Sequence, residues 1–335
     1  MKFIALTIIS ALLISSCQPK KSEYLKIAGY AQGTSFHITY ENSNNQDYGE
    51  AIDSILSAFD KSCSMYDSTS IISRINNNDP TVEADNWFID VFKKSVEVNA
   101  LSEGALDITV GPVVRAWGFG AQPMAKHDTA YIDSLLQYVG MEKVKLVGRK
   151  IIKQLPGVSL DVNGVAQGYS VDLLAEFFDK KRIKNYLVEI GGEVRSKGTN
   201  AKNTLWHVGI DRPADNNLIP GQQIQAIVEL NNKSMTTAGN YRKFFVENGV
   251  KYGHTINPKT GYPAKNTMLS ATVVADDAVT ADAWDTAFMV LGIEKSKEIL
   301  KTLKGIDVYF IYSNEKGEYE IYCSDGLKKM IIEQK

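Results

Sequence analysis

The amino-acid sequence predicts an α+β fold, with mixed, largely antiparallel sheets, flanking helices and two intimately joined subdomains. Two observations support this prediction. Short apolar runs typical of strands and longer runs with helical spacing follow one another without the strict alternation of a parallel α/β fold. The chain has 335 residues, 44% of them hydrophobic, which is enough to bury a substantial core.

In the N-terminal half, glycines separate the strands and helical spacing marks the helices. Gly33 divides two apolar runs and predicts a hairpin, and Gly148 predicts another. Apolar residues recur with helical spacing between Ile52 and Phe59. The predicted strands are 24–28, 35–40, 144–147, 151–154 and 158–161, and the predicted helices are 50–66, 71–75, 86–101 and 130–139. The Gly- and aromatic-rich residues 113–120 fit no regular element.

In the C-terminal half, a helix is predicted from the turn at Gly164 to about Lys181, where basic side chains favour a helix end. Gly292 is a natural stop for another helix. Residues 233–241 and 253–261 are rich in turn-forming residues and predict loops. The remaining predicted elements are strands at 186–190, 206–210, 225–230, 243–246, 269–274, 308–312 and 319–322, and helices at 280–291 and 296–303.

The charged residues are nearly balanced, since 37 basic and 39 acidic residues leave a net charge of −2. A nucleic-acid-binding surface needs a basic excess, which this composition lacks. No spacing of the 3 cysteines and 4 histidines is typical of a zinc site. An oxidising compartment permits a disulfide between Cys63 and Cys323, and two buried free thiols are the alternative.

The first residues are typical of a secretion signal. Lys2 is followed by an apolar run at 3–14, too short to span a bilayer, and then by two serines and Cys17. An aliphatic residue and small residues ahead of a cysteine resemble the signal of bacterial lipoproteins, in which that cysteine carries the lipids. A plain signal peptide is the alternative.

The lipoprotein interpretation divides the chain into three parts. We expect a lipoprotein signal peptide at 1–16, a polar tether at 17–23 and one folded domain at 24–335. The mature protein would then sit in the cell envelope, held by its lipids on the periplasmic side of a bacterial membrane.

Asp282 and Thr286 form the first candidate site. They lie four residues apart near the start of a predicted helix and therefore share one face. A carboxylate and a hydroxyl side by side are half of a site for Mg²⁺, which takes one or two carboxylates and completes its shell with water and phosphate oxygens. In the alternative, Asp282 only caps the first turn and Thr286 has no special role.

Two further stretches carry candidate chemistry. Residues 161–168 read as a strand, a glycine turn and a helix, and such a turn either binds a phosphate with its backbone amides or is simply a tight connection. His254 lies in a Gly/Pro-rich loop, where it can accept a proton from a hydroxyl nucleophile, or it is structural. The aromatic side chains that either stack on a flat ring or pack internally are Tyr66, Trp117, Phe119 and Tyr169.

Together these stretches resemble one family, the FAD:protein FMN transferases or ApbE-type lipoproteins. The resemblance covers nearly the whole mature chain. Each motif is modest alone, and it is their common order along the chain that makes the resemblance specific. The motifs lie at 33–36, 64–66, 104–112, 117–120, 161–168 with Asp172, 191–193, 236–239, 254–261, and 281–283 with Thr286.

The resemblance implies a magnesium-dependent transfer of FMN from FAD to a threonine hydroxyl of a target protein, with release of AMP. It implies that Asp282, Thr286 and the carbonyl of Gly164 hold Mg²⁺, and that His254 takes the proton of the acceptor hydroxyl. The FAD contacts that it implies are Gln32, Tyr66, Ala105, Leu106, Asp107, Asp161, Gln167 and His254. The implied targets are membrane subunits of sodium-pumping NADH:quinone or Rnf-type complexes that bear an acceptor threonine.

The chain departs from the family pattern at several positions. Gln32 stands where Met is common, Gln167 where a charged residue is frequent, and Ala238 where Ser is common. Trp284 and Asp285 replace smaller apolar residues. Asp285 therefore adds a carboxylate near the predicted metal, where it either provides a second ion site or faces solvent.

Two other functions compete with the transferase. An FAD pyrophosphatase would let water attack, giving FMN and AMP, and a flavin-binding lipoprotein would not catalyse at all. His254 beside a complete metal set favours an enzyme, because a binding protein needs neither.

Overall fold

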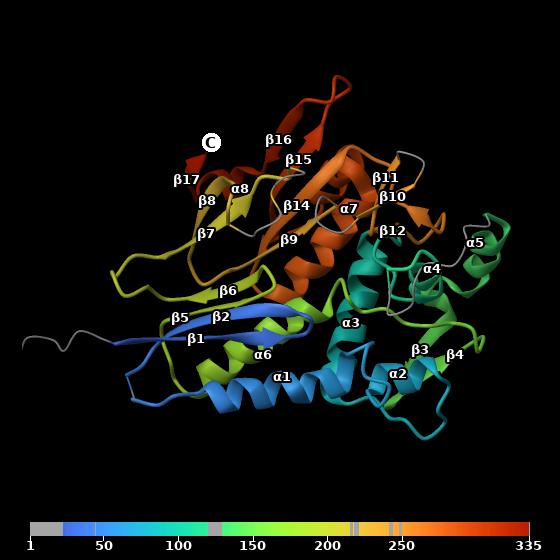
Figure 1. Ribbon diagram of the computed structural model, residues 1–335, viewed down its shortest axis with the longest axis horizontal. Coiled ribbons are helices and arrows are strands. Elements are labelled where there is room, and N and C mark those ends of the chain that lie inside the picture. Colours follow the sequence, from blue (N-terminus) through green and yellow to red (C-terminus); the bar gives the residue numbers. More distant parts are fainter. Residues whose placement is uncertain are drawn as a thin grey trace, which may run out of the picture.

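One antiparallel sheet of eight strands forms the centre of the fold (Figure 1). The computed structural model describes residues 23–43, 45–119, 129–214, 217, 221–240, 244–247 and 250–334. The strands of the sheet, in spatial order, are β1 (Tyr24–Ala31), β2 (Thr34–Glu41), β5 (Tyr186–Ile190), β6 (Glu193–Lys197), β9 (Ser234–Gly239), β14 (Met268–Ala275), β15 (Asp307–Ser313) and β16 (Tyr319–Cys323). The pairing of β6 with β9 joins the group β1, β2, β5 and β6 to the group β9, β14, β15 and β16 in one continuous sheet.

Four smaller sheets complete the strand content of the described residues. They are β17 (Ile331–Gln334) with β8 (Ile224–Leu230) and β7 (Trp206–Asp211), then the hairpins β3 (Val144–Val147) with β4 (Lys150–Lys153), β10 (Phe244–Glu247) with β11 (Val250–Gly253), and β12 (Ile256–Asn257) with β13 (Tyr262–Pro263). Antiparallel sheets with separate helices confirm the predicted α+β class.

Helices cover one face of the large sheet. In Figure 1, α1 (Gly49–Cys63) and α6 (Ala166–Lys180) lie beneath β1, β2, β5 and β6, while α7 (Ala278–Leu300) lies against β9 and β14. The other helices are α2 (Ile71–Asn76), α3 (Asn86–Leu101), α4 (Gly111–Ala116), α5 (Thr129–Leu135) and α8 (Asp325–Lys328). No helix in the described part of the chain is long and apolar enough to span a bilayer.

The buried apolar side chains form separate clusters on the two faces of the large sheet. On the helical face, Phe178 of α6 packs with Ile52 of α1 and Val188 of β5. A second cluster there joins α3, α7 and β14 through Phe88, Phe288 and Val273. The opposite face packs against β7, β8 and α8. The large sheet is therefore buried on both faces, with α6 and α7 side by side on one of them.

Most predicted elements are confirmed, but α4 was missed because its sequence looked irregular. Gly111–Ala116 is helical although residues 113–120 were expected to be irregular. Pro112 lies in the first turn, where its missing N–H costs no hydrogen bond and its fixed φ suits a helix. The predicted signal peptide at 1–16 and the predicted lipid-bearing Cys17 lie outside the described residues.

Several predictions in the second half were wrong for a different reason. Residues 233–241 contain strand β9 instead of a loop, since Thr is a good strand former and Thr236 pairs with Val273 of β14. The predicted loop at 253–261 contains the two-residue strand β12. By contrast, the helix stop predicted at Gly292 is confirmed, because α7 consists of two helical segments separated by a kink at Gly292, where φ is +73°. The second segment ends at Leu300 instead of 303.

The predicted strand at 158–161 belongs to no sheet. The side chain of Asn76 takes the place of a neighbouring strand, because it accepts from the N–H of Leu160 at 2.7 Å and donates to its carbonyl at 2.9 Å. A single bridge connects Ser159 with Val110. The segment is nevertheless extended and leads directly into the turn before α6.

The start of α7 is held by a buried carboxylate from α6. Asp172 accepts the N–H groups of Ala278 and Val279 at 2.9 Å each, and it pairs with Arg195 of β6. Burial raises the pKa of Asp172, and Arg195 and the two N–H groups act in the opposite direction. This one carboxylate therefore connects α6, α7 and the large sheet.

Replacing Asp172 should strongly destabilise the fold. In Asp172→Ala, Arg195 loses its partner and two helix N–H groups lose their acceptor, so we expect unfolding to become easier by about 3–5 kcal/mol. Urea denaturation measures the change, with Asp325→Ala as a control that removes an exposed carboxylate paired with Lys328. A loss no larger than that of the control would contradict this role.

Candidate functional site

Three carboxylates are buried together where α7 meets the large sheet. Asp282 and Asp285 of α7 are only 4% and 2% exposed, and Glu193 begins β6. Burial raises the pKa of Asp282 to about 7, although the hydrogen bond from the N–H of Gly168 acts in the opposite direction. Burial and the charge of Asp282 raise the pKa of Asp285 well above its usual range. Asp285 therefore does not face solvent, which was one of its two predicted positions.

The glycine turn before α6 lies directly against α7. The N–H of Gly168 donates to Oδ2 of Asp282 at 2.7 Å. A Cβ on Gly168 would lie 2.3 Å from the carbonyl oxygen of Ala278, and one on Gly164 would lie 2.7 Å from Oγ1 of Thr286. The structure thus brings together Gly164, Asp282 and Thr286, the three residues that were predicted to hold a metal.

The donor atoms at this place fit a hard cation. Asp282 uses only Oδ2 in its hydrogen bond to Gly168, and the Thr286 hydroxyl makes only a long contact of 3.4 Å with Oδ1 of Asp285. Oε2 of Glu193 is inaccessible to solvent and has no hydrogen-bond partner among the residues that the structure describes. No group of three or more His, Cys, Asp or Glu side chains in the described ranges converges as metal ligands do. A cation here would depend on hydroxyl, carbonyl and water oxygens as well, as Mg²⁺ does.

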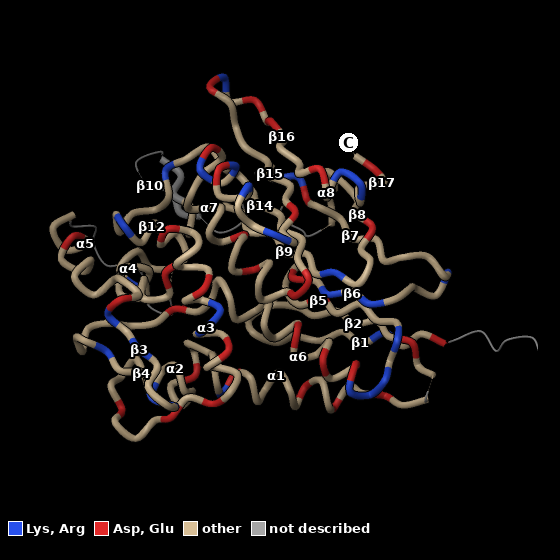
Figure 2. The backbone as a smooth tube through the Cα atoms, turned by 180° about the vertical axis from the view of Figure 1, so that it is seen from behind, with Lys and Arg blue, Asp and Glu red and all other residues tan. Residues whose placement is uncertain are grey.

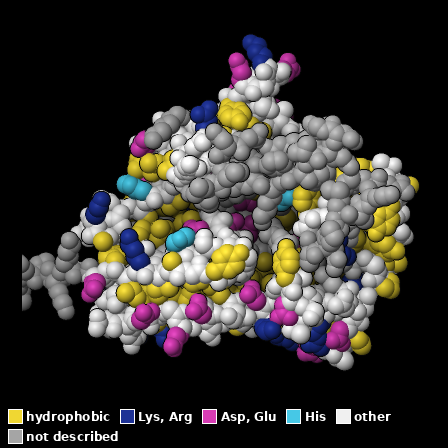
Figure 3. Space-filling model, in the orientation of Figure 1, with side chains coloured by type: hydrophobic (Ala, Val, Ile, Leu, Met, Phe, Trp, Pro, Cys, Tyr) yellow, Lys and Arg dark blue, Asp and Glu magenta, His cyan; other side chains and the backbone are white. Residues whose placement is uncertain are grey.

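Figure 3 shows acidic side chains recessed in a hollow near the middle of the face seen in Figure 1. Elsewhere, basic and acidic residues are interspersed along the chain, as the tube in Figure 2 shows. The cluster of buried carboxylates at α7 is therefore a local feature, since acidic and basic residues are interspersed over the rest of the chain.

A small pocket collects several predicted flavin contacts. It has a volume of about 80 Å³, and its lining includes Gln32, Tyr66 and Gln167. The Tyr66 ring is 68% exposed, so a flat ligand can stack on it. Within the described residues, Nε2 of Gln32 has no hydrogen-bond partner, whereas Nε2 of Gln167 donates to the carbonyl of Ile190 at 3.0 Å. Gln32 thus offers a free donor, and Gln167 offers its carbonyl oxygen.

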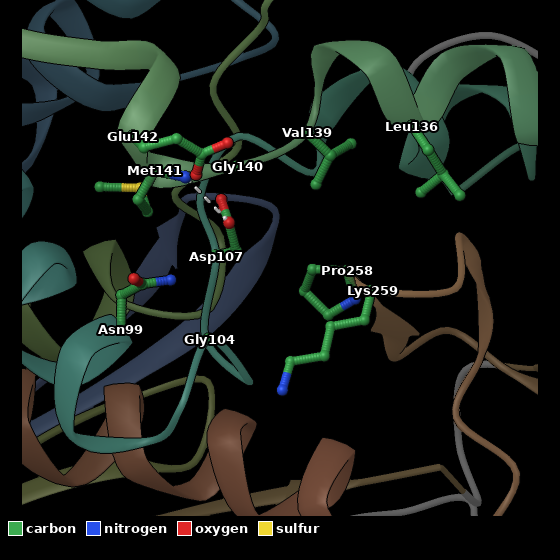
Figure 4. Close-up of a pocket in the computed structure, with 10 residues that line it drawn as sticks. All are labelled: Asn99, Gly104, Asp107, Leu136, Val139, Gly140, Met141, Glu142, Pro258 and Lys259. Carbon is green, nitrogen blue, oxygen red and sulfur yellow. Dashed lines mark hydrogen bonds between the residues drawn. The ribbon is translucent and has the colours of Figure 1, made fainter.

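A second, larger pocket separates the segment around Asp107 from the loop that carries His254 (Figure 4). It measures about 390 Å³, and Lys259 extends its side chain into it. Oδ1 of Asp107 accepts from the N–H and hydroxyl of Thr109, and Oδ2 accepts from the N–H of Met141. The Asp107 carboxylate therefore shapes the pocket wall. Ala105 and Leu106 are buried, so they can offer only backbone atoms to a ligand.

Asp161 lies between these two regions of the site. Its N–H donates to the carbonyl of Ile108 at 2.6 Å, which ties the Asp161 segment to the Asp107 segment. Burial raises the pKa of Asp161, while the N–H of Asn163 and the charge of Arg115 lower it. The segments 105–111 and 158–168 therefore form one continuous wall.

His254 is half-buried, in a loop anchored at both ends. Its ring meets that of Phe119 edge-on at 6.2 Å. Thr255 donates to Asn240, the residue after β9, and Nε1 of Trp117 donates to the carbonyl of Gly261 at 2.7 Å. Trp117 is buried and packs against Tyr262, so it does not offer a stacking face.

Some predicted candidates have structural roles, and one residue near the site was not predicted. The Tyr169 hydroxyl donates to Asp90, and its ring packs on Phe59. Cys63 and Cys323 are both free thiols, so the disulfide left open by the sequence is not formed. Glu193 was overlooked as a site residue. Its signal was present, since it follows a predicted strand and a glycine pair at 191–192.

The fold and site define an α+β protein in which the glycine turn before α6 meets buried carboxylates of α7, and in which predicted FAD contacts line two pockets. A sequence model described as the ApbE family matches residues 32–310. The chain belongs to the ApbE family.

Relatives match this chain over nearly its whole length. The FAD:protein FMN transferase of Haemophilus influenzae is 34% identical, covering 96% of this chain and 95% of the relative. That of Escherichia coli K12 is 32% identical, covering 95% and 93%. The flavin transferase ApbE from Vibrio cholerae superposes with a TM-score of 0.83 at 31% identity, covering 92% of this chain and 99% of that structure.

The raised pKa of Asp282 predicts that the metal-free protein loses stability as the pH rises. Between about pH 4 and 7 the unfolded chain has released this proton while the folded chain retains it. The free energy of unfolding should then fall by up to about 1.4 kcal/mol per pH unit for each such proton. Urea denaturation in EDTA across this range measures the slope, which should be shallower in Asp282→Asn. Equal slopes in the two proteins would contradict the shift.

Proposed function

We infer that this chain is an FAD:protein FMN transferase, which moves FMN from FAD onto a target protein and releases AMP. The observation that carries this inference is the buried acidic face of α7 against the Gly164 turn, in a chain whose relatives along its full length bear that activity in their names. Residues predicted to contact FAD line both pockets, and the larger pocket, of about 390 Å³, has the size of a small-molecule site.

The proposed cation is Mg²⁺, held by Asp282, Thr286 and the carbonyl of Gly164. When bound, it supplies Lewis-acid stabilisation of the charge that develops on the pyrophosphate as the bond to AMP breaks. The oxygen-only donor set and the unpartnered Oε2 of Glu193 support this choice. Without a cation, the buried carboxylates repel the anionic pyrophosphate, so FAD binding should require the metal.

The proposed base is His254, and the proposed acceptor group is a threonine hydroxyl. The oxygen of that hydroxyl attacks the phosphate of the FMN half, and a ring nitrogen of His254 accepts its proton. Support comes from the position of His254 in a loop that also lines the larger pocket through Pro258 and Lys259. Tyr66 offers an exposed ring at the smaller pocket, which suits the isoalloxazine.

Replacing His254 should separate transfer from binding. In His254→Ala we expect FAD binding to persist, while flavinylation of an acceptor domain falls by about 10²–10⁴-fold, the usual contribution of a general base. The residual rate should rise with pH, because hydroxide partly replaces the base. Mass spectrometry of an acceptor with one threonine, incubated with FAD and Mg²⁺, measures the transfer.

The controls for this assay are a Thr→Val acceptor and the addition of EDTA, each of which should abolish transfer. Release of FMN and AMP without any acceptor labelling would favour an FAD pyrophosphatase. Loss of FAD binding in His254→Ala, with normal turnover of the bound fraction, would make His254 a flavin contact instead of the base.

We also propose that the protein is a lipoprotein anchored through Cys17 on the periplasmic side of a bacterial membrane. The signal-like residues 1–16 and the polar tether at 17–23 support this location. Membrane subunits with an acceptor threonine, of the sodium-pumping NADH:quinone or Rnf type, would then lie within reach of the tethered domain.

Replacing Cys17 should release the protein from the membrane fraction. Cys17→Ala removes the atom that carries the lipids, and a single tether has no other anchor in this proposal. Fractionation and mass spectrometry of the N-terminus measure the effect, with Cys323→Ser as the control. An unmodified Cys17 in the wild type, with unchanged fractionation of the variant, would contradict the anchor.

A further inference from the structure

Glu193 is a half-buried acid at the start of β6. Its Oε2 is inaccessible to solvent and has no hydrogen-bond partner within the described part of the chain. The acids that act on it are Asp282 and Asp285 from α7 and, more weakly, Glu189 from β5. A buried carboxylate oxygen without any donor is costly, and such groups are concentrated at functional sites.

The nearest basic side chain on the same strand does not neutralise Glu193. Arg195 points to the same face of β6 but donates to Asp172, whose carboxylate also holds the start of α7. The next residue of β6, Val194, points to the opposite face and packs in the core there. Among the described residues, no basic side chain therefore compensates Glu193, and the other acids near it raise its pKa further.

The arrangement favours an indirect role for Glu193. The three carboxylates do not converge as the ligands of one ion would. The turn at Gly164 and Gly168 contacts Thr286 and Asp282. The oxygen atoms that could bind the ion directly therefore lie on the side of the site formed by this turn and α7. Mg²⁺ usually keeps several of its waters, and these waters need hydrogen-bond acceptors when the ion is buried.

We propose that Glu193 is a positioning residue of the cation site, whose carboxylate accepts hydrogen bonds from the waters of the ion bound at Asp282 and Thr286. This inference rests on the metal site of the proposed function. Glu193 then sets both the affinity for the ion and the preference for Mg²⁺, which retains its waters, over Ca²⁺, which exchanges them for more protein oxygens. The glycine pair before Glu193 lets the chain turn sharply from β5 into β6, with φ of +62° at Gly191 and +110° at Gly192.

Metal titration of the purified full chain without FAD tests this role. Mn²⁺ serves as the probe, followed by the signal of the free ion in electron paramagnetic resonance, and Mg²⁺ and Ca²⁺ compete for the site. In Glu193→Gln we expect Mn²⁺ and Mg²⁺ to bind about 10–100-fold more weakly, the usual effect of losing an outer partner of a metal site, with a smaller change for Ca²⁺. The control is Glu229→Gln, on β8 in the other sheet, which should bind as the wild type does.

A second readout separates this role from a structural one. In EDTA, Glu193→Gln should melt at or above the temperature of the wild type, because one of three repelling acids is gone, yet gain less stability when Mg²⁺ is added. If the Gln variant does not fold, Glu193→Asp replaces it, and a shorter carboxylate should weaken Mn²⁺ binding without abolishing it.

The possible results distinguish this inference from the proposed function. The role of Glu193 is overturned if Glu193→Gln, or the folded Asp variant, binds Mn²⁺ within twofold of the wild type while Asp282→Ala loses binding. The metal site itself would then still stand. Unchanged Mn²⁺ binding in Asp282→Ala overturns the metal site itself. An equal loss for Mg²⁺ and Ca²⁺ overturns the water-mediated role and makes Glu193 a source of charge only.

Discussion

The site depends on the close approach of the turn before α6 to helix α7. Neither Gly164 nor Gly168 has a Cβ, and one on either residue would collide with Thr286 or with the carbonyl of Ala278. Only because that space is empty can the N–H of Gly168 reach Asp282 at 2.7 Å. Backbone donors and carbonyls thus meet the acidic face of a helix at a distance that side chains would prevent.

The same contact explains how the fold tolerates so many buried acids. Asp172 ties the first turn of α7 to α6 and, through Arg195, to β6, so the surrounding elements cannot move apart to hydrate Asp282 and Asp285. Their raised pKa values express the resulting penalty. Groups held at such a cost are typical of sites that bind an ion or perform chemistry. Stability and function therefore conflict at α7, and the apolar cores around it offset the cost.

The accuracy of the sequence predictions followed the strength of the local pattern. The helix at 86–101 was predicted with its bounds, because its apolar spacing and the following Gly104 are local signals. The hairpins β1–β2 and β3–β4 were found for the same reason. Strand β9 was missed, because its threonines became strand residues only through pairing with β14, which is distant in sequence. For the site, Asp282, Thr286 and Gly164 were named from motifs, whereas Glu193 was not.

The sequence by itself determined the helices and hairpins with strong local periodicity and the family resemblance, and from that resemblance came the residues of the proposed cation site. These properties depend on residues close together in sequence or on the order of motifs along the chain, so the sequence alone contains them. Only the tertiary structure decided that Asp285 is buried and that the Asp107 carboxylate is occupied by Thr109 and Met141. It also decided that Oε2 of Glu193 finds no hydrogen-bond partner in the described ranges. Burial, hydrogen-bond partners and the distances between charges are set by elements far apart in sequence, so no local pattern contains them.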